Sequence, residues 1–141
     1  IIIDNFITFS RIKIPETEGM KDEQTKCRFL TVTPDEKKVY VTSLMLNKIF
    51  SINMVKDDIK TFKQEVKEPA GIAIDPRSNH IFVSSRGKKS VEVFNCDLGY
   101  LGQFLHQQDK VPIGLCVHDN NLYVATNENF AIMKVPINYG K

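Results

Sequence analysis

Short apolar runs separated by turn residues make up most of the pattern of hydrophobic and polar positions along this chain. The clearest stretch runs from Pro69 to Leu105, where apolar or β-branched runs alternate with turn pairs such as Asp75-Pro76 and Arg86-Gly87. It predicts four successive strands, at 71–74, 81–83, 91–94 and 100–105. Similar runs precede and follow this stretch, so the chain is predicted to repeat one unit.

The repeat has a nearly constant period. Val41, Val83 and Val124 recur at intervals of 42 and 41 residues, and Pro69-Ala70-Gly71 returns as Pro112-Ile113-Gly114. A four-stranded unit of about 40 to 45 residues is the period of a β-propeller blade. We therefore expect an all-β fold of four-stranded antiparallel blades, with blade repeats at 27–63, 69–105 and 112–137.

The N-terminal part is predicted to add one more strand. Residues 1–14 end in alternating apolar and basic positions, Ile12, Lys13 and Ile14, which is typical of an outer strand with one wetted face. Residues 15–26 are polar and are expected to form a loop. These strands suffice for about three blades. Since propellers have about four to eight, we expect the chain to be half of a six-bladed propeller.

The second repeat carries the most regular motif. Its positions are Pro69, Gly71, Ile72, Ala73, Ile74 and Asp75, then Ile81, Phe82, Val83 and Ser84, then Val91, Val93 and Phe94. This motif resembles the NHL repeat, and the chain is similar to the NHL domain of tripartite-motif proteins. Where that family often has Asp after the second strand, this chain has Ser43, Ser85 and Thr126-Asn127.

The resemblance implies one of three kinds of function. NHL repeats occur in tripartite-motif ubiquitin ligases, in scaffolding and RNA-binding proteins, and in a few metal-dependent enzymes. The resemblance therefore fixes the fold better than the function.

Composition narrows the class of protein and its expected location. The 141 residues are 42% hydrophobic with a net charge of +2, as in a globular domain, and no apolar run approaches the roughly 20 residues of a membrane span. We expect no membrane contact, no signal peptide and a cytoplasmic location. Cys27, Cys96 and Cys116 lack C-x-x-C spacing, which argues against a disulfide framework or a zinc site. Cys116 is expected to be a core residue.

Antiparallel connectivity predicts which loops share a face. The loops from the second to the third strand of each blade lie at the same end as the connections from the fourth strand to the next blade, and propellers generally bind there. The resulting candidate binding residues are Asn47, Lys48, Arg86, Lys88, Lys89, Asn127 and Asn129. Over the whole chain the charges of these connections cancel, whereas a phosphate-tracking groove needs converging basic residues. A protein partner is therefore favoured over RNA, although the patch Arg86-Gly87-Lys88-Lys89 leaves RNA open.

The sequence offers little for catalysis. His80, His106 and His118 are not expected to converge, and there is no G-x-S-x-G elbow or Gly-rich phosphate loop. We expect no catalytic residue, metal or cofactor. The favoured hypothesis is a non-enzymatic module that recruits a protein partner or substrate. It would belong to a larger protein like the tripartite-motif ligases or a scaffold, with any ubiquitin-ligase activity in another domain. The alternatives are an RNA-binding NHL domain and a metal-dependent propeller lyase or hydrolase.

The last expectation concerns how the missing blades of the propeller are supplied. Three blades leave two open edges, which invite association. We expect either a head-to-tail homodimer, in which strand 7–14 of one chain completes the sheet ending at 131–135 of the other, or a propeller whose remaining blades come from the parent chain.

Overall fold

The structure is a computed structural model, and it describes residues 27–106, 109–127 and 132–138. The expected outer strand at 1–14, the loop at 15–26 and Asn129 lie outside these residues. The described segments contain strands connected by turns, with no helix that is long and apolar enough to cross a membrane.

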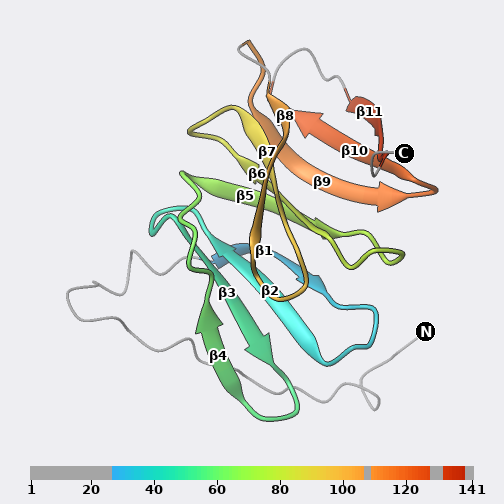
Figure 1. Ribbon diagram of the computed structural model, residues 1–141. Helices are drawn as coiled ribbons and strands as arrows, with labels where there is room; N and C mark the ends of the chain where they lie inside the picture. The colour runs from blue at the N-terminus through green and yellow to red at the C-terminus, as the bar shows by residue number, and fades with distance from the viewer. Residues whose placement is uncertain (1–26, 107–108, 128–131, 139–141) are drawn as a thin grey trace, which may run out of the picture.

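Eleven strands form three antiparallel sheets, which we call blades 1 to 3 (Figure 1). Blade 1 has the order β1-β2-β3-β4 and consists of β1 (Cys27–Val32), β2 (Lys38–Ser43), β3 (Lys48–Asn53) and β4 (Asp58–Thr61). Blade 2 has the order β5-β6-β7-β8 and consists of β5 (Pro69–Ile74), β6 (Ile81–Ser85), β7 (Ser90–Phe94) and β8 (Tyr100–His106). Blade 3 has the order β11-β10-β9 and consists of β9 (Pro112–His118), β10 (Asn121–Thr126) and β11 (Ile132–Pro136). The prediction of an all-β fold with about three blades is confirmed.

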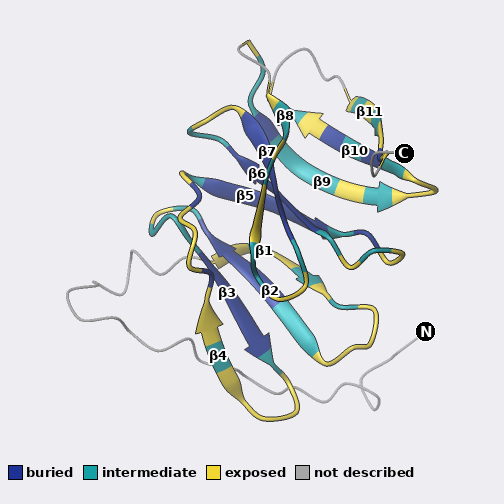
Figure 2. Cartoon of the chain, in the orientation of Figure 1, coloured by how far each residue is buried: buried dark blue, intermediate teal, exposed yellow. Residues whose placement is uncertain are grey.

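The blades stack face to face, with their first strands next to one another. β5 contacts β1 on one side and β9 on the other. Blade 2 is therefore covered on both faces, and its strands β5, β6 and β7 are buried (Figure 2). The outermost strands of the first two blades, β4 and β8, are largely exposed. The burial of β6 explains the unbroken apolar run at Ile81 to Val83, because a strand that is covered on both faces has no wetted side.

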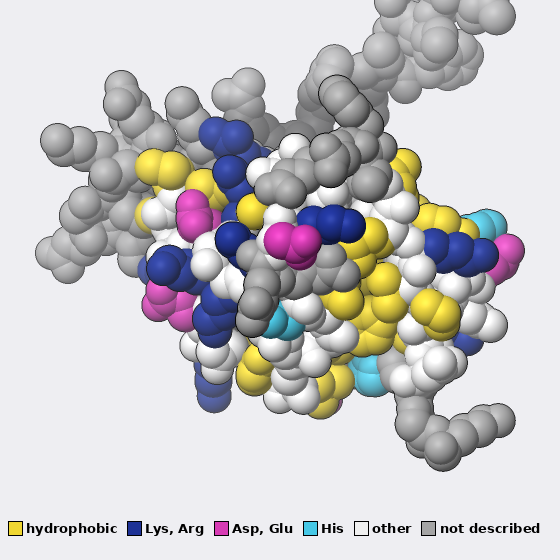
Figure 3. Space-filling view, turned by 90° about the horizontal axis from the view of Figure 1, so that it is seen from above, with side chains coloured by type: hydrophobic (Ala, Val, Ile, Leu, Met, Phe, Trp, Pro, Cys, Tyr) yellow, Lys and Arg dark blue, Asp and Glu magenta, His cyan; other side chains and the backbone are white. Residues whose placement is uncertain are grey.

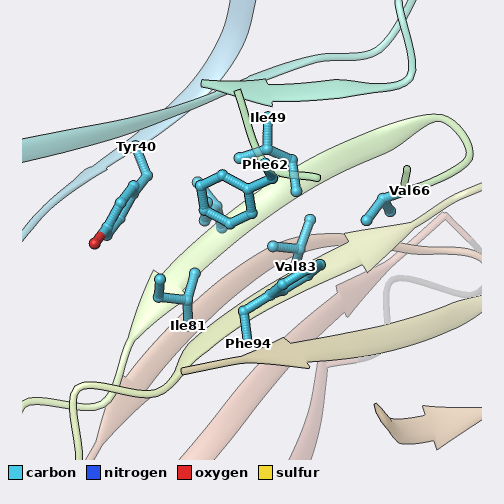
Figure 4. Close-up of a cluster of buried hydrophobic side chains, with 8 residues drawn as sticks. Tyr40, Ile49, Phe62, Val66, Ile81, Val83 and Phe94 are labelled. Carbon is cyan, nitrogen blue, oxygen red and sulfur yellow. The ribbon is translucent and has the colours of Figure 1, made fainter. Parts of the chain in front are cut away.

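Each gap between blades is filled by a hydrophobic core. Between blades 1 and 2, the Phe62 ring lies edge-on to Tyr40 and to Phe94, with ring centroids 5.6 and 5.1 Å apart (Figure 4). Between blades 2 and 3, Phe82 packs with Leu122 and Val124. The side chains of β6 alternate, so that Ile81 and Val83 belong to the first core and Phe82 to the second.

The inner strands approach so closely that backbone meets backbone. A Cβ atom at Gly71 would collide with the carbonyl oxygen of Ile113, and Ser84 Oγ donates a hydrogen bond of 2.7 Å to that same carbonyl. One blade earlier, Thr42 Oγ1 donates to the carbonyl of Ala70 at 2.7 Å. A hydroxyl on the second strand thus fastens each blade to the first strand of the next.

A buried carboxylate interrupts the apolar packing of blade 2. Glu92 is 3% exposed and accepts hydrogen bonds from Ser90 Oγ at 3.0 Å and from the Tyr100 hydroxyl at 2.7 Å. Phe50 and Met133 occupy the corresponding positions of β3 and β11. The two hydroxyl donors compensate for the removal of this carboxylate from water.

We expect the phenol of Tyr100 to titrate late. The hydrogen bond to Glu92, followed by burial and the Glu92 charge, raises the pKa of Tyr100 from 10 to about 12. Because this pKa is raised, the protonated phenol stabilises the fold fully below pH 10, and that contribution is lost as the pH rises toward 12. In an absorbance titration, Glu92→Gln should move this tyrosine toward lower pH and Tyr100→Phe should remove its step. An unchanged curve for Glu92→Gln would contradict the assignment.

Candidate binding face

Tight turns form the end of the blades where binding was predicted. The turn between β2 and β3 ends at Asn47, with φ of 54°, and the turn between β6 and β7 ends at Lys89, with φ of 53°. Asparagine adopts this left-handed conformation more readily than lysine does. The two turns occupy corresponding places in blades 1 and 2, and both point to the left side of Figure 1.

The connection from blade 1 to blade 2 joins these two turns. The Glu68 amide donates to Asn47 Oδ1 at 2.8 Å, and the Arg86 amide donates to the Glu68 carbonyl at 3.0 Å. Ser85 Oγ also donates to the Lys67 carbonyl at 2.6 Å. The structure therefore brings Asn47 and Arg86 to the same end of adjacent blades.

In blade 3, the residue after β10 is hydrogen-bonded to the segment before β9 in a similar way. The Asn127 amide donates to the Val111 carbonyl at 3.1 Å, and the Val111 amide donates to Asn127 Oδ1 at 3.3 Å. Val111 lies directly before β9, as Glu68 lies directly before β5, so Asn127 is at the same end as Arg86. We call this end, with Asn47, Lys48, Arg86, Lys88, Lys89 and Asn127, the candidate face. Its role in binding stays a prediction.

Basic side chains predominate on the described part of this face. Figure 3 shows Lys and Arg side chains gathered toward the end that carries the turns. Its described turns and connections contain more basic than acidic residues, with Lys48, Lys63, Lys67, Arg86, Lys88, Lys89 and Lys110 against Glu65, Glu68 and Asp109. The charge balance expected for the whole chain also counted acidic residues outside the described ranges, so the described face is more basic than the sequence total suggested.

Arg86 stands out among these residues. Its Nε atom is buried, and it has no hydrogen-bond partner among the described residues. Lys88 and Lys89 beside it are exposed, and Lys88 is held in place by its amide, which donates to Ser85 Oγ at 3.2 Å. Buried donors in native proteins nearly always have a partner, so an unpaired Nε is an unusual feature of this turn.

Two hollows larger than the space at the candidate face lie at the opposite end of the blades, which was not predicted to bind. A groove of about 390 Å³ between blades 1 and 2 is lined by residues that include Asp35, Tyr40 and Asp97. Burial, and then the nearby Cys96 and the two aspartates, raises the pKa of Tyr40. At the candidate face, the space between blades 2 and 3 measures only about 10 Å³, which is room for about one water. The turns around the 390 Å³ groove were predicted from the sequence, but the groove itself depends on how blades 1 and 2 diverge.

Among the described residues, neither the metal-ligating side chains nor Cys116 forms part of a functional cluster. No three His, Cys, Asp or Glu side chains of the described residues come together as a metal site. Cys116 is exposed and not in the core, so that prediction is wrong. It lies on the face of β9 that points away from blade 2, where alternation alone could not reveal whether another blade covers it.

Comparison with known proteins identifies the architecture. No protein-family model matches the chain, and no curated protein matches it by sequence. Solved structures do match. A protein assigned as a gluconolactonase has a TM-score of 0.71 at 13% identity, covering 86% of this chain and 47% of its own. Virginiamycin B lyase from Staphylococcus aureus has a TM-score of 0.63 at 15% identity, covering 76% and 36%. A nidogen/laminin complex has a TM-score of 0.64 at 23% identity, covering 72% and 40%.

The chain is part of a β-propeller. It spans less than half the length of each of these propeller chains. At these identities the likeness shows the fold alone, and the resemblance to the tripartite-motif NHL domain is not shown.

The expectation that the protein is not an enzyme is wrong. The protein assigned as a gluconolactonase and the lyase are enzymes with this architecture, so it is an architecture that enzymes use. The prediction rested on three separated histidines and on absent motifs, which exclude only the catalytic arrangements that those motifs describe.

Proposed function

We propose that this chain contributes three blades to a propeller that binds a protein partner through an acidic segment of that partner. The observation that carries the proposal is the group of basic residues Lys48, Arg86, Lys88 and Lys89 on the candidate face. In this role the chain would act like the partner-recruiting NHL domain of a tripartite-motif protein.

The chemistry of Arg86 suits a carboxylate. A guanidinium presents parallel N–H groups that a carboxylate can accept as a pair of hydrogen bonds. The exposed lysines beside it, Lys88 and Lys89, would raise the local concentration of acidic ligands. Because the Arg86 amide is hydrogen-bonded to Glu68, the side chain is presented from a fixed turn.

The shape of the face supports a protein over a small molecule or RNA. The basic residues are spread over turns of different blades. The space between blades 2 and 3 at this face holds about one water, whereas small-molecule pockets measure about 300 to 1,000 Å³. Glu65 and Glu68 interrupt the basic residues, which disfavours a continuous phosphate chain. The structural neighbours include a complex between two proteins, nidogen and laminin.

Arg86→Gln is expected to weaken binding of a fluorescein-labelled oligoglutamate peptide by about tenfold or more, because a charge-assisted hydrogen bond is lost. Binding would be followed by fluorescence anisotropy at two salt concentrations and should weaken at the higher one. Lys56→Gln is the matched control, since Lys56 is exposed in the turn between β3 and β4, at the other end of blade 1.

Equal loss in both variants would contradict a specific role for the candidate face, and so would tighter binding of a single-stranded oligouridylate than of the peptide. In the latter case the RNA-binding alternative would replace the proposal.

A second candidate function is that of a propeller enzyme acting on a small molecule, which the lactonase and lyase structures favour. Among the described residues no metal-ligand set supports a metal-dependent route. Hydrolysis of gluconolactone by the purified chain, followed by acid release against a heat-inactivated control, would favour this candidate over partner binding.

A further inference from the structure

The groove of about 390 Å³ between blades 1 and 2 lies at the end of the blades opposite the candidate face. Its walls come from the turn between β1 and β2 of blade 1, and from the turns between β5 and β6 and between β7 and β8 of blade 2. Its volume is within the range of about 300 to 1,000 Å³ that small-molecule sites have. The groove is therefore large enough for a small ligand, whereas the space between blades 2 and 3 at the candidate face is not.

The Tyr40 side chain extends from the core into this groove. The residue is only 2% exposed, and its ring packs edge-on against Phe62. The hydroxyl points away from Phe62 and Val66 in Figure 4, and Tyr40 is one of the residues that line the groove. Within the described ranges this hydroxyl has no hydrogen-bond partner, although a tyrosine buried to this extent usually has one. The groove thus contains a polar group that the described fold does not use.

The charged side chains of the groove favour a cation. Asp35 of blade 1 and Asp97 of blade 2 line it, and Lys38 is the one basic residue among its lining residues, so two negative charges face one positive charge. Thr33 Oγ1 and the Lys37 amide donate to Asp35 Oδ1 at 2.6 and 3.0 Å, and these bonds hold the pKa of Asp35 below its ordinary value. Because both bonds use Oδ1, the second oxygen of this carboxylate remains available to a ligand.

An organic cation suits the groove better than a metal ion does. In the part of the chain that the structure describes, no three His, Cys, Asp or Glu side chains are arranged to hold a metal. Pro34, Ile74 and Pro76 give the groove apolar walls. A hydrocarbon stem would be buried against these walls, as the stems of lysine and arginine are buried on apolar surfaces. A bare metal ion would make no use of them.

We propose that the groove binds a small organic cation, whose ammonium or guanidinium group is held by Asp35 and Asp97 and donates a hydrogen bond to the Tyr40 oxygen. Such a group has at least three N–H donors, which suffices for two carboxylates and one phenol oxygen. Its binding residues come from two blades, so the ligand would also fasten blade 1 to blade 2. The groove would be a second binding site, separate from the candidate face.

Agmatine is a suitable probe, since it carries a guanidinium and an ammonium group on a short aliphatic stem. Isothermal titration calorimetry with the wild-type chain should show binding that weakens as salt is added. Tyr40→Phe removes only the hydroxyl, so its melting temperature should stay near that of the wild type while agmatine binding weakens about fivefold. Asp97→Asn removes a charged acceptor and should weaken agmatine binding about tenfold.

Asp57→Asn is the matched control for Asp97→Asn. Asp57 is exposed in the turn between β3 and β4, at the same end of the blades, and does not line the groove. The variant loses the same charge and should bind agmatine as the wild type does. A blocked peptide with a single arginine shows where the cation comes from. Binding as tight as that of agmatine would assign the groove to a basic side chain of a protein, and weaker binding would assign it to a free small molecule.

Three results would overturn the proposal. One is tighter binding of glutarate than of agmatine, because Lys38 would then decide the charge preference. The second is agmatine binding that is absent, or that Tyr40→Phe leaves unchanged. The third is an equal loss of affinity in Asp57→Asn and Asp97→Asn, which would mean unspecific attraction. The groove and the candidate face lie at opposite ends of the blades, so failure of oligoglutamate binding would leave this proposal unaffected.

Discussion

Gly71→Ala is expected to destabilise the chain strongly. The added methyl group would collide with the Ile113 carbonyl and would lie 2.8 Å from the Leu115 nitrogen. Both atoms belong to the backbone of β9, so neither can rotate away, and blades 2 and 3 would have to separate. We expect a loss of about 3 kcal/mol or more in the free energy of unfolding, measured by urea denaturation with circular dichroism.

Gly114→Ala is the control for this effect. The same substitution in the next repeat would place a Cβ at an ordinary contact distance of 3.5 Å from Ala125. It should keep the far-ultraviolet spectrum and a cooperative transition. If the two alanine variants unfolded alike, blades 2 and 3 could not approach as closely as the structure has them.

Phe94→Ala is expected to cost about 4 kcal/mol, because it removes a ring from a fully buried site. Phe94 lies 5.1 Å from the Phe62 ring, which in turn contacts Tyr40 of blade 1, so the aromatic chain in Figure 4 extends from one blade to the next. Since domains are stable by only about 5 to 15 kcal/mol, this loss should lower the melting temperature strongly in calorimetry.

Phe94→Leu distinguishes lost packing from a general intolerance at this site. Leucine fills most of the space and should cost only about 1 kcal/mol. Should the alanine variant lose no more stability than the leucine variant, the ring would not join the two blades in the way the structure indicates.

Regular spacing made the blades predictable from the sequence. Val41, Val83 and Val124 recur at blade intervals because each lies opposite the same position of the first strand, with Val83 paired to Ile72 and Val124 to Leu115. Connectivity then brings the turns at Asn47 and Arg86 to one end, since consecutive antiparallel strands reverse direction. Both inferences need only local patterns.

Features that depend on the neighbouring blade could not be predicted in this way. The repeat places Glu92 where Phe50 and Met133 occur, and nothing local indicates that Ser90 and Tyr100 will satisfy a buried carboxylate there. The exposure of Cys116 depends on the absence of a described blade beside β9. The groove at the opposite end depends on the divergence of two sheets, which no stretch of sequence encodes alone.

The connections at the candidate face differ in a way that affects motion. Asn47 Oδ1 accepts a hydrogen bond from the Glu68 amide across the seam between blades 1 and 2. The matching position at the next seam is Lys89, whose side chain can donate hydrogen bonds but cannot accept one. There the Val111 amide donates to Asn127 within blade 3. In hydrogen–deuterium exchange, the Glu68 amide should therefore report the joint opening of blades 1 and 2. The Val111 amide should stay protected when blade 3 tilts away as a unit. The two amides therefore report different motions, since only the Glu68 bond has to break when two blades separate.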